Sequence, residues 1–293
     1  MDVSTLLQEV EAKRQNAWRS YLFCGLMGIA PVAMFLLQKT SAALVLSALW
    51  IFYYLLLTRP DRKKYAAAFL RGNLLASLSS LLEGVAYHGK TGLPREELLA
   101  EKLLPIREEN SFMTFHRTSG TSRRLEVTLS DVSFQLDAPD EKGRPQFFSG
   151  CWVQIKLDRP TGLRLRLVTA DLAAPSLLTP WFEEKAGLSP LSLEPHRAAR
   201  VFTAWGEKNS PGLTQSALGH LMDLREKKDL PLAMGLEEDH LAVFFPRRFL
   251  SAGEPSLRAP VTEAALLRSP LPELEELLKA AVACARAAAP ESV

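Results

Sequence analysis

The chain has 293 residues, of which 47% are hydrophobic and 23% charged, and its formal net charge is +2. This near-neutral balance gives no electrostatic reason to expect a nucleic acid as partner. The three cysteines, Cys24, Cys151 and Cys284, are too few and too far apart for a disulfide framework or a CxxC metal knuckle. We therefore expect a reducing compartment, no metal ion and no other cofactor.

Residues 1–17 are expected to form a short amphipathic helix, because Val3, Leu6, Leu7 and Val10 recur at helical spacing. The positions between them are largely polar. Such a helix can lie on a membrane surface or dock on a soluble domain, and the sequence does not choose between the two.

Two apolar runs without an internal charge follow, over residues 21–37 and 42–57. With its flanking residues, each run approaches the about 20 residues that a helix needs to cross a bilayer. The polar stretch 38–41 predicts a turn between them. We therefore expect residues 18–58 to form a transmembrane helical hairpin.

Residues typical of a membrane–water interface flank the hairpin. Aromatic rings favour the headgroup level, and lysine and arginine are retained on the cytoplasmic side. The predicted interface set is Trp18, Arg19, Tyr21, Tyr53, Tyr54, Arg59, Arg62, Lys63 and Lys64. Because the turn carries only Lys39, we expect a multi-pass protein of the inner (plasma) membrane with both termini cytoplasmic, its cations facing the anionic lipids of the inner leaflet. We expect residues 59–62 to end the second helix.

Two other interpretations of the apolar runs stay open. A secretory signal peptide also has a basic start and an apolar core, although that core is usually shorter. Two buried helices of a soluble bundle usually show polar stripes, whereas the first run is apolar on all sides. Within that run, Pro31 predicts a kink, and Gly25 and Gly28 predict a close approach of the second helix.

Residues 59–110 are predicted to be a basic juxtamembrane and helical segment. Leucines at helical spacing continue beyond Lys64, and we expect this helix to end between Gly84 and Gly89. A second helix should begin at Pro94, because Glu96 and Glu97 would then lie in its first turn, where the helix dipole favours them.

Residues 111–293 predict a cytoplasmic α+β domain with a mainly antiparallel sheet and flanking helices, because strands precede helices without regular alternation. The expected strands are residues 113–116, 125–129, 132–136, 147–156, 163–168, 201–205, 232–236 and 241–245, with a hairpin turn at 140–143. The expected helices are residues 214–227 and 272–288. In residues 163–167 the leucines should face one side of the sheet and the arginines the other.

One stretch matches a phosphate-binding loop, G-x-x-x-x-G-K-[ST], through Gly84, Gly89, Lys90 and Thr91. A true loop of this kind is entered by a strand and followed at once by a helix. Here the preceding segment looks helical, and Gly92 and Pro94 delay the next helix. We interpret the match as a coincidence and keep a nucleotide-binding hydrolase as the alternative function.

No other pattern predicts catalysis. The five histidines lack metal-ligand spacing, and no serine lies in G-x-S-x-G. Glu237, Glu238 and Asp239 cluster, but in an expected turn. We therefore expect a binding module rather than an enzyme, with Trp152, Trp181 and Trp205 as candidate exposed aromatics for a partner.

A family resemblance runs through most of the chain. It is carried by Ser130-Asp131-Val132, Phe148-Ser149-Gly150, Val201-Phe202, a helix over 213–225 and a hairpin over 232–245. These features resemble a bacterial membrane-anchored family of unknown function (DUF3137-like). The resemblance implies two membrane helices, a cytoplasmic α+β module, and company with a LemA-type membrane protein. The chain departs from it at residues 116–120, where relatives carry an acidic, glycine-containing turn. Assembly through oligomerisation of the hairpin is a further alternative.

Overall fold

A computed structural model describes residues 2–89, 91–106, 112–137, 144–193, 196–207, 213, 215–228, 231–247, 256–268 and 271–287. The chain divides into two compact units. The first comprises residues 1–77 and 252–269, and the second comprises residues 78–251 and 270–293.

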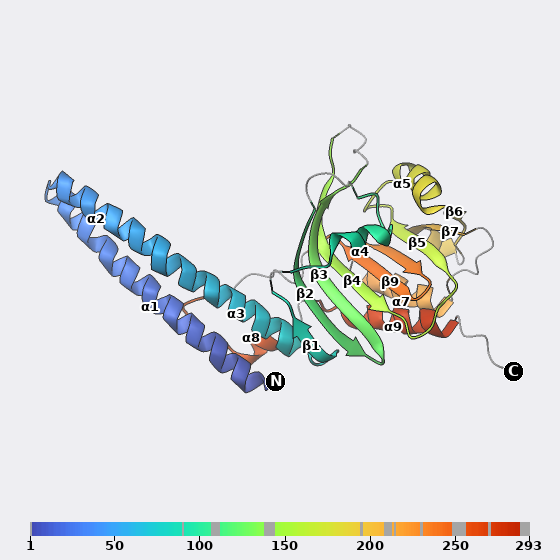
Figure 1. Ribbon diagram of the computed structural model, residues 1–293, viewed down its shortest axis with the longest axis horizontal. Helices are drawn as coiled ribbons and strands as arrows, with labels where there is room; N and C mark the ends of the chain where they lie inside the picture. The colour runs from blue at the N-terminus through green and yellow to red at the C-terminus, as the bar shows by residue number, and fades with distance from the viewer. Residues whose placement is uncertain are drawn as a thin grey trace. The chain divides into compact units, whose positions relative to one another are not determined.

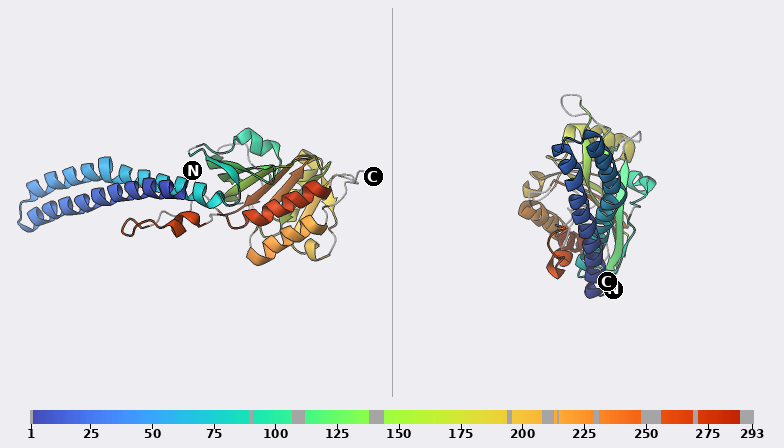
Figure 2. Two further views of the ribbon diagram at one scale, coloured as in Figure 1. Left: turned by 90° about the horizontal axis from the view of Figure 1, so that it is seen from below. Right: turned by 90° about the vertical axis from the view of Figure 1, so that its left-hand side faces the viewer.

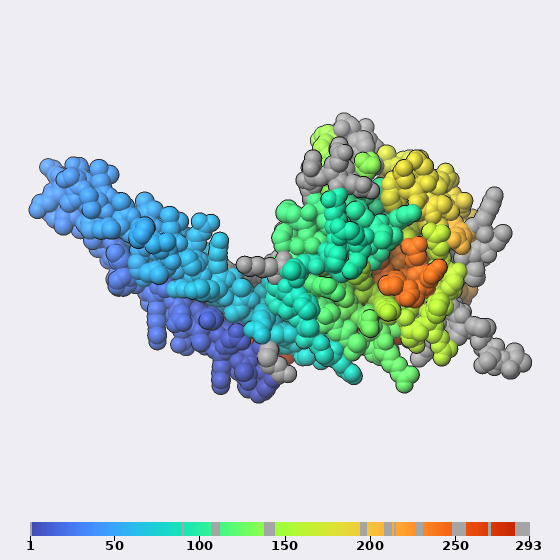
Figure 3. All heavy atoms as spheres, viewed as in Figure 1, coloured from blue at the N-terminus to red at the C-terminus, as the bar shows by residue number. Residues whose placement is uncertain are grey.

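The first unit is a helical hairpin. Helix α1 (Val3–Leu36) packs beside a second long helical stretch made of α2 (Thr40–Tyr53), the π-helical turn η1 (Tyr54–Thr58) and α3 (Arg59–Leu78) (Figures 1 and 3). The short helix α8 (Glu263–Leu267) also belongs to this unit. The amphipathic residues 1–17 are therefore not a separate helix, because they form the first half of α1, which also continues through Pro31.

The prediction that residues 59–62 end the second helix is wrong. The helix continues from Thr40 to Leu78 across Pro60. Proline lacks an N–H, and its ring collides with the carbonyl four residues earlier in a regular α-helix. The π-helical turn just before it, in which the N–H of Arg59 bonds to the carbonyl of Tyr54, widens the backbone at this point and lets the helix pass.

Helix α3 also ends earlier than the sequence suggests. It stops at Leu78, and strand β1 (Glu83–Tyr87) replaces the expected continuation to residues 84–89. Ser79 and Ser80 explain the stop, because serine hydroxyls compete for backbone hydrogen bonds and favour turns. The apolar residues after them were misread as a helical period.

The second unit is built on one antiparallel sheet. Its strands are β1, β2 (Met113–Ser122), β3 (Leu125–Gln135), β4 (Phe147–Lys156), β5 (Arg164–Thr169), β6 (Ser189–Leu191), β7 (Phe202–Gly206), β8 (Ala233–Glu237) and β9 (His240–Phe245). They lie in the order β1-β2-β3-β4-β9-β8-β5-β7-β6. The helices are α4 (Arg95–Ala100), α5 (Pro175–Trp181) with the π-helical turn η2 (Phe182–Ala186), α6 (His196–Ala199), α7 (Gln215–Lys228) and α9 (Leu274–Ala287).

Helices cover both faces of this sheet. Helix α4 lies on one face, and α7 and α9 lie on the other (Figures 1 and 2). Trp152, Phe134 and Phe244 face α4, in a core that also contains Leu98 and Leu103. Their strand neighbours point to the opposite face because side chains alternate along a strand.

The predicted fold class, α+β with an apolar helix pair and a mainly antiparallel sheet, is confirmed. Strand β4 has the predicted bounds, and the expected pair 125–129 and 132–136 is one strand, β3. The expected turn at 140–143 lies outside the described residues. The sequence did not indicate α5, η2, β6, α6 or α8.

Candidate functional site

The hairpin carries a large apolar surface. Among the described residues, all but three of the exposed large hydrophobic side chains lie between Tyr21 and Leu57. Leu26 is 65% exposed and Leu36 is 75% exposed. A soluble monomer rarely leaves such a contiguous apolar patch in water. Both helices are long and apolar enough to cross a membrane.

Polar contacts between the helices mark where this apolar surface ends. The Ser20 hydroxyl donates to Asp61 Oδ2 at 2.6 Å, and the Thr58 hydroxyl donates to the Ser20 carbonyl at 3.4 Å. Thr58 is 2% exposed. Asp61 also forms an ion pair with Lys64. These bonds bring residues 18–21 of α1 to the level of residues 58–61, so the flanks of the two apolar runs meet at one height.

The structure thereby brings most of the predicted interface residues together. Trp18 and Tyr21 stack with ring centroids 6.3 Å apart. Arg19, Tyr21, Tyr54, Arg59, Arg62, Lys63 and Lys64 are exposed, and Trp18 and Tyr53 are half-buried. We call this set the interface belt. Aromatic rings and cations at the end of an apolar helix pair are the composition found at membrane surfaces.

Beyond the belt, α1 and α3 pack on each other as a helix pair would in water. Leu6 and Val10 of α1 are buried with Tyr65 and Phe69 of α3. Val261 and Leu266, from the segment 256–268, complete this cluster. The amphipathic start of α1 therefore buries its apolar face within its own unit.

Side chains also hold the segment 256–268 in place. Arg14 donates to the carbonyl of Leu257, and the carboxylate of Glu11 accepts from the backbone N–H of Val261 at 3.1 Å. Arg14 and Glu11 also bond to each other. The bonds from Arg14 and Val261 lower the pKa of Glu11 to about 2.

Asn73 fixes the end of α8 in the same segment. Its amide nitrogen donates to the carbonyls of Ala265, Leu266 and Arg268 at 2.9–3.2 Å. These are carbonyls that a helix end leaves without an intrahelical partner. We call Glu11, Arg14 and Asn73 the clamp. The sequence did not predict the clamp, because its partners are backbone atoms 192–250 residues away.

The stretch that matches a phosphate-binding loop has a different geometry. Helix α3 ends at Leu78, before the motif, and Gly84 and the three residues after it are part of strand β1, which starts at Glu83. Their backbone pairs with β2, with Ala86 opposite Ser119 and Tyr87 opposite Thr118. The next helix, α4, begins at Arg95 rather than after Thr91. Gly89 and Thr91 lie in the connecting turn, and Lys90 lies outside the described residues.

Two of the three tryptophans proposed as exposed contacts are buried, and the third is partly exposed. Trp152 and Trp205 are fully buried, and Trp181 is half-buried against the core on the α4 face. The two buried indoles pack against other aromatic rings. Trp205 contacts Phe182, and Trp152 contacts Phe134 and Phe244. The expectation is wrong for Trp152 and Trp205, because a tryptophan in a strand of a sheet covered on both faces is buried in either orientation.

A buried polar cluster lies beneath the end of α4. Arg166 of β5 is 1% exposed and donates to the carbonyls of Glu101, Lys102, Leu165 and Leu236. Its guanidinium also pairs with Glu237 at 2.8 Å. The side chain crosses Gly235, where an added Cβ would come within 3.2 Å of it. Leucines and arginines do alternate as predicted, but Arg166 points into protein rather than water.

Glu101 completes this cluster and has an unusual protonation equilibrium. Its carboxylate accepts from the Trp152 indole at 2.8 Å and from the Gln154 amide. Burial raises its pKa to about 7, although both hydrogen bonds oppose the shift. Every polar partner in this arrangement is part of the domain itself. The cluster therefore anchors α4 to the sheet.

Other sequence candidates are scattered. Within the described part of the chain, no three histidine, cysteine, aspartate or glutamate side chains are grouped to hold a metal ion. Glu237 is the last residue of strand β8 rather than part of the expected turn, and it pairs with both Arg164 and Arg166. Cys24, Cys151 and Cys284 are buried free thiols.

Comparisons with known proteins add little. No known family model matches the chain, and a search of curated proteins finds no match. Among solved structures, the chain is similar to the crystal structure of the mycobacterial trehalose monomycolate transport factor A. The TM-score is 0.36 at 10% sequence identity, over 77% of this chain and 98% of that chain. Such a likeness supports no functional argument, so the geometry of the two units must carry the proposal.

Proposed function

We propose that the chain is a membrane-anchored binding protein of the inner (plasma) membrane. Residues 18–58 cross the bilayer twice, both termini are cytoplasmic, and the α+β unit recognises a partner at the inner leaflet. The proposal includes no catalytic activity. The resemblance to the DUF3137-like family supports the same organisation, with a LemA-type membrane protein as one candidate partner.

The observation that carries this proposal is the pairing of the apolar surface with the interface belt. From Trp18 to Leu36, and again from Thr40 to Thr58, each helix rises about 28 Å at 1.5 Å per residue, close to the roughly 30 Å of a bilayer core. Basic residues gather at the belt, whereas Lys39 is alone at the turn. This asymmetry favours a cytoplasmic belt.

Binding rather than catalysis is supported by the use of polar groups in the sheet unit. Hydrogen bonds within the domain occupy the side chains of Arg166, Glu101 and Glu237. Their partners are main-chain carbonyls, neighbouring side chains and one another. A catalytic group needs donor or acceptor capacity that is directed at a substrate. The belt, in contrast, presents exposed cations, each worth about 1 kcal/mol of attraction to an anionic leaflet.

Two experiments test the proposal. In the first, the full-length protein is reconstituted into vesicles with and without phosphatidylglycerol. In the second, it is crosslinked in native membranes. We expect resistance to alkaline extraction, closer contact of the belt with anionic vesicles, and a specific partner crosslinked to the sheet unit. Arg62→Gln, Lys63→Gln and Lys64→Gln together should weaken the lipid preference, whereas Gln15→Ala and Asn16→Ala should not. Release of the protein from the membrane at alkaline pH would contradict the proposal. Crosslinks that join only the hairpins of two copies of the chain would contradict it too.

A further inference from the structure

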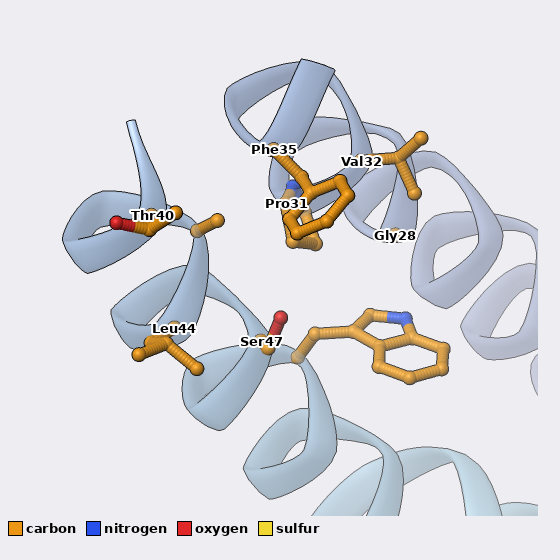
Figure 4. Close-up of a pocket in the computed structure, with 9 residues that line it drawn as sticks. Gly28, Pro31, Val32, Phe35, Thr40, Leu44 and Ser47 are labelled. Carbon is orange, nitrogen blue, oxygen red and sulfur yellow. The ribbon is translucent and has the colours of Figure 1, made fainter. Parts of the chain in front are cut away.

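A groove lies along the seam between α1 and α2, in the half of the hairpin nearest the turn. Its volume is about 550 Å³. It is lined by Gly28, Pro31, Val32 and Phe35 from α1 and by Thr40, Ala43, Leu44, Ser47 and Trp50 from α2 (Figure 4). Each row follows the i, i+3, i+4, i+7 spacing of one helix face, so the groove runs parallel to the helices.

The two helices meet at the deep end of this groove. The Trp50 indole N–H donates to the Cys24 carbonyl at 2.8 Å. A Cβ added to Gly28 would lie 3.2 Å from that indole nitrogen. The glycine therefore admits the indole, which closes the groove toward the belt. Toward the turn, the small side chains of Ala43 and Ser47 leave the space between the helices open.

The dimensions select the kind of occupant. From Thr40 to Trp50 the helix rises about 15 Å at 1.5 Å per residue, which is half of a roughly 30 Å hydrocarbon core and hence one leaflet. A helix is about 10 Å across, so a second helix would reach into the groove only with its side chains. A single hydrocarbon chain needs far less cross-section.

The lining agrees with that choice. It carries no charged side chain, and its hydroxyls belong to Thr40, beside the turn, and Ser47. A lipid inserted from the turn side would place its ester groups near Thr40 and its methylenes against Val32, Phe35 and Leu44. We propose that this groove binds one acyl chain of a phospholipid from the leaflet on the turn side. The inference rests on the proposed membrane-spanning role of the hairpin.

The test uses full-length protein in phosphatidylcholine–phosphatidylglycerol vesicles that contain a trace of phospholipid with a photoreactive diazirine in one acyl chain. After irradiation, mass spectrometry maps the labelled residues. Val32 and Ser47 should be labelled several-fold more than Val45 and Leu49, which face outward on the same helix pair. This comparison within the wild-type protein needs no variant.

Two substitutions sharpen the result. Ser47→Leu fills the groove and should reduce labelling of Val32 to the level of Val45, whereas Ala48→Leu adds the same bulk on the exposed side and should leave it unchanged. Equal labelling of both faces, no effect of Ser47→Leu, or disulfide-linked dimers through Ser47→Cys in place of lipid labelling would overturn the inference. Alkaline extraction of the vesicles separates the two failures, because protein that stays in the bilayer without groove labelling refutes the lipid site alone.

Discussion

The hairpin and the sheet unit place the same residue types in opposite positions. In the hairpin, large apolar side chains such as Leu26 and Phe35 point outward. In the sheet unit, Trp152 and Trp205 are fully buried, and so is the charged Arg166. Hydrophobic burial explains the position of the two tryptophans in water, and a hydrocarbon solvent would explain the outward apolar side chains. Where a side chain lies therefore reports the solvent that each unit is built for.

Polar groups show the same contrast. The hairpin has no charged side chain between the belt and the turn, whereas the sheet unit admits an ion pair and a carboxyl of raised pKa to its α4 face. A buried charge is tolerated only when its hydrogen bonds are satisfied. Each substitution below tests one side of this contrast.

The largest effect should follow Arg166→Met. The substitution removes the buried donor that holds the end of α4, while Glu237 keeps Arg164 as a partner. A buried acceptor left without its donor costs about 1–3 kcal/mol, and Arg166 serves several of them. Thermal unfolding in detergent, followed by near-ultraviolet circular dichroism of the buried tryptophans, measures it. Arg164→Met, at a partly exposed site, should cost about 1 kcal/mol or less; equal losses would show that the Arg166 network has no special role.

Leu26→Arg tests whether this face of the hairpin contacts water or lipid. At the surface of a water-soluble protein this change is within about 0.5 kcal/mol, whereas at mid-bilayer an arginine costs about 3 kcal/mol. We expect the fraction of protein that resists alkaline extraction to fall. Gln15→Arg, on the aqueous half of α1, is the control and should not alter it. Unchanged membrane integration of Leu26→Arg would indicate that this face does not contact lipid.

Glu101→Gln should flatten the pH dependence of stability. Because burial raises the folded pKa of Glu101 to about 7, folding favours its protonated form. Its contribution is fully present below the unfolded value near 4.5 and is lost as pH rises through 7. Wild type should therefore lose about 3 kcal/mol of stability between pH 4 and pH 8 that the variant keeps. Parallel pH profiles of unfolding for the two proteins would count against a buried carboxyl.

Asn73→Ala should have the smallest effect. It removes three hydrogen bonds to the end of α8, at a cost of about 1–2 kcal/mol. The loss should be local, so hydrogen exchange of residues 256–268 should accelerate while the sheet stays protected. Asn16→Ala, an exposed asparagine of the same hairpin, should leave exchange unchanged. Faster exchange of the sheet instead would show that Asn73 supports the fold more widely.

How far the sequence predicted this molecule depended on where each signal was local. The polar turn between the apolar runs and the strand β4 are local signals, so the turn was predicted almost correctly and β4 with its observed bounds. The clamp was not, since Asn73 and Arg14 bind backbone carbonyls of a distant segment that has no periodic pattern. The burial of Arg166 was not predicted, because alternation reveals two faces of a strand but not which of them meets water. The predicted end of α3 was too late, because the leucine spacing fits a helix on both sides of Ser79.

The most direct test of the account is the accessibility of the hairpin turn. In intact cells, Lys39→Cys should react with a membrane-impermeant maleimide, whereas Ala67→Cys in α3 should react only after permeabilisation. The native cysteines are buried and give little background. Labelling of residue 67 but not residue 39 from outside, or recovery of the full-length protein as freely soluble without detergent, would contradict a hairpin that spans the bilayer with its belt at the cytoplasmic face.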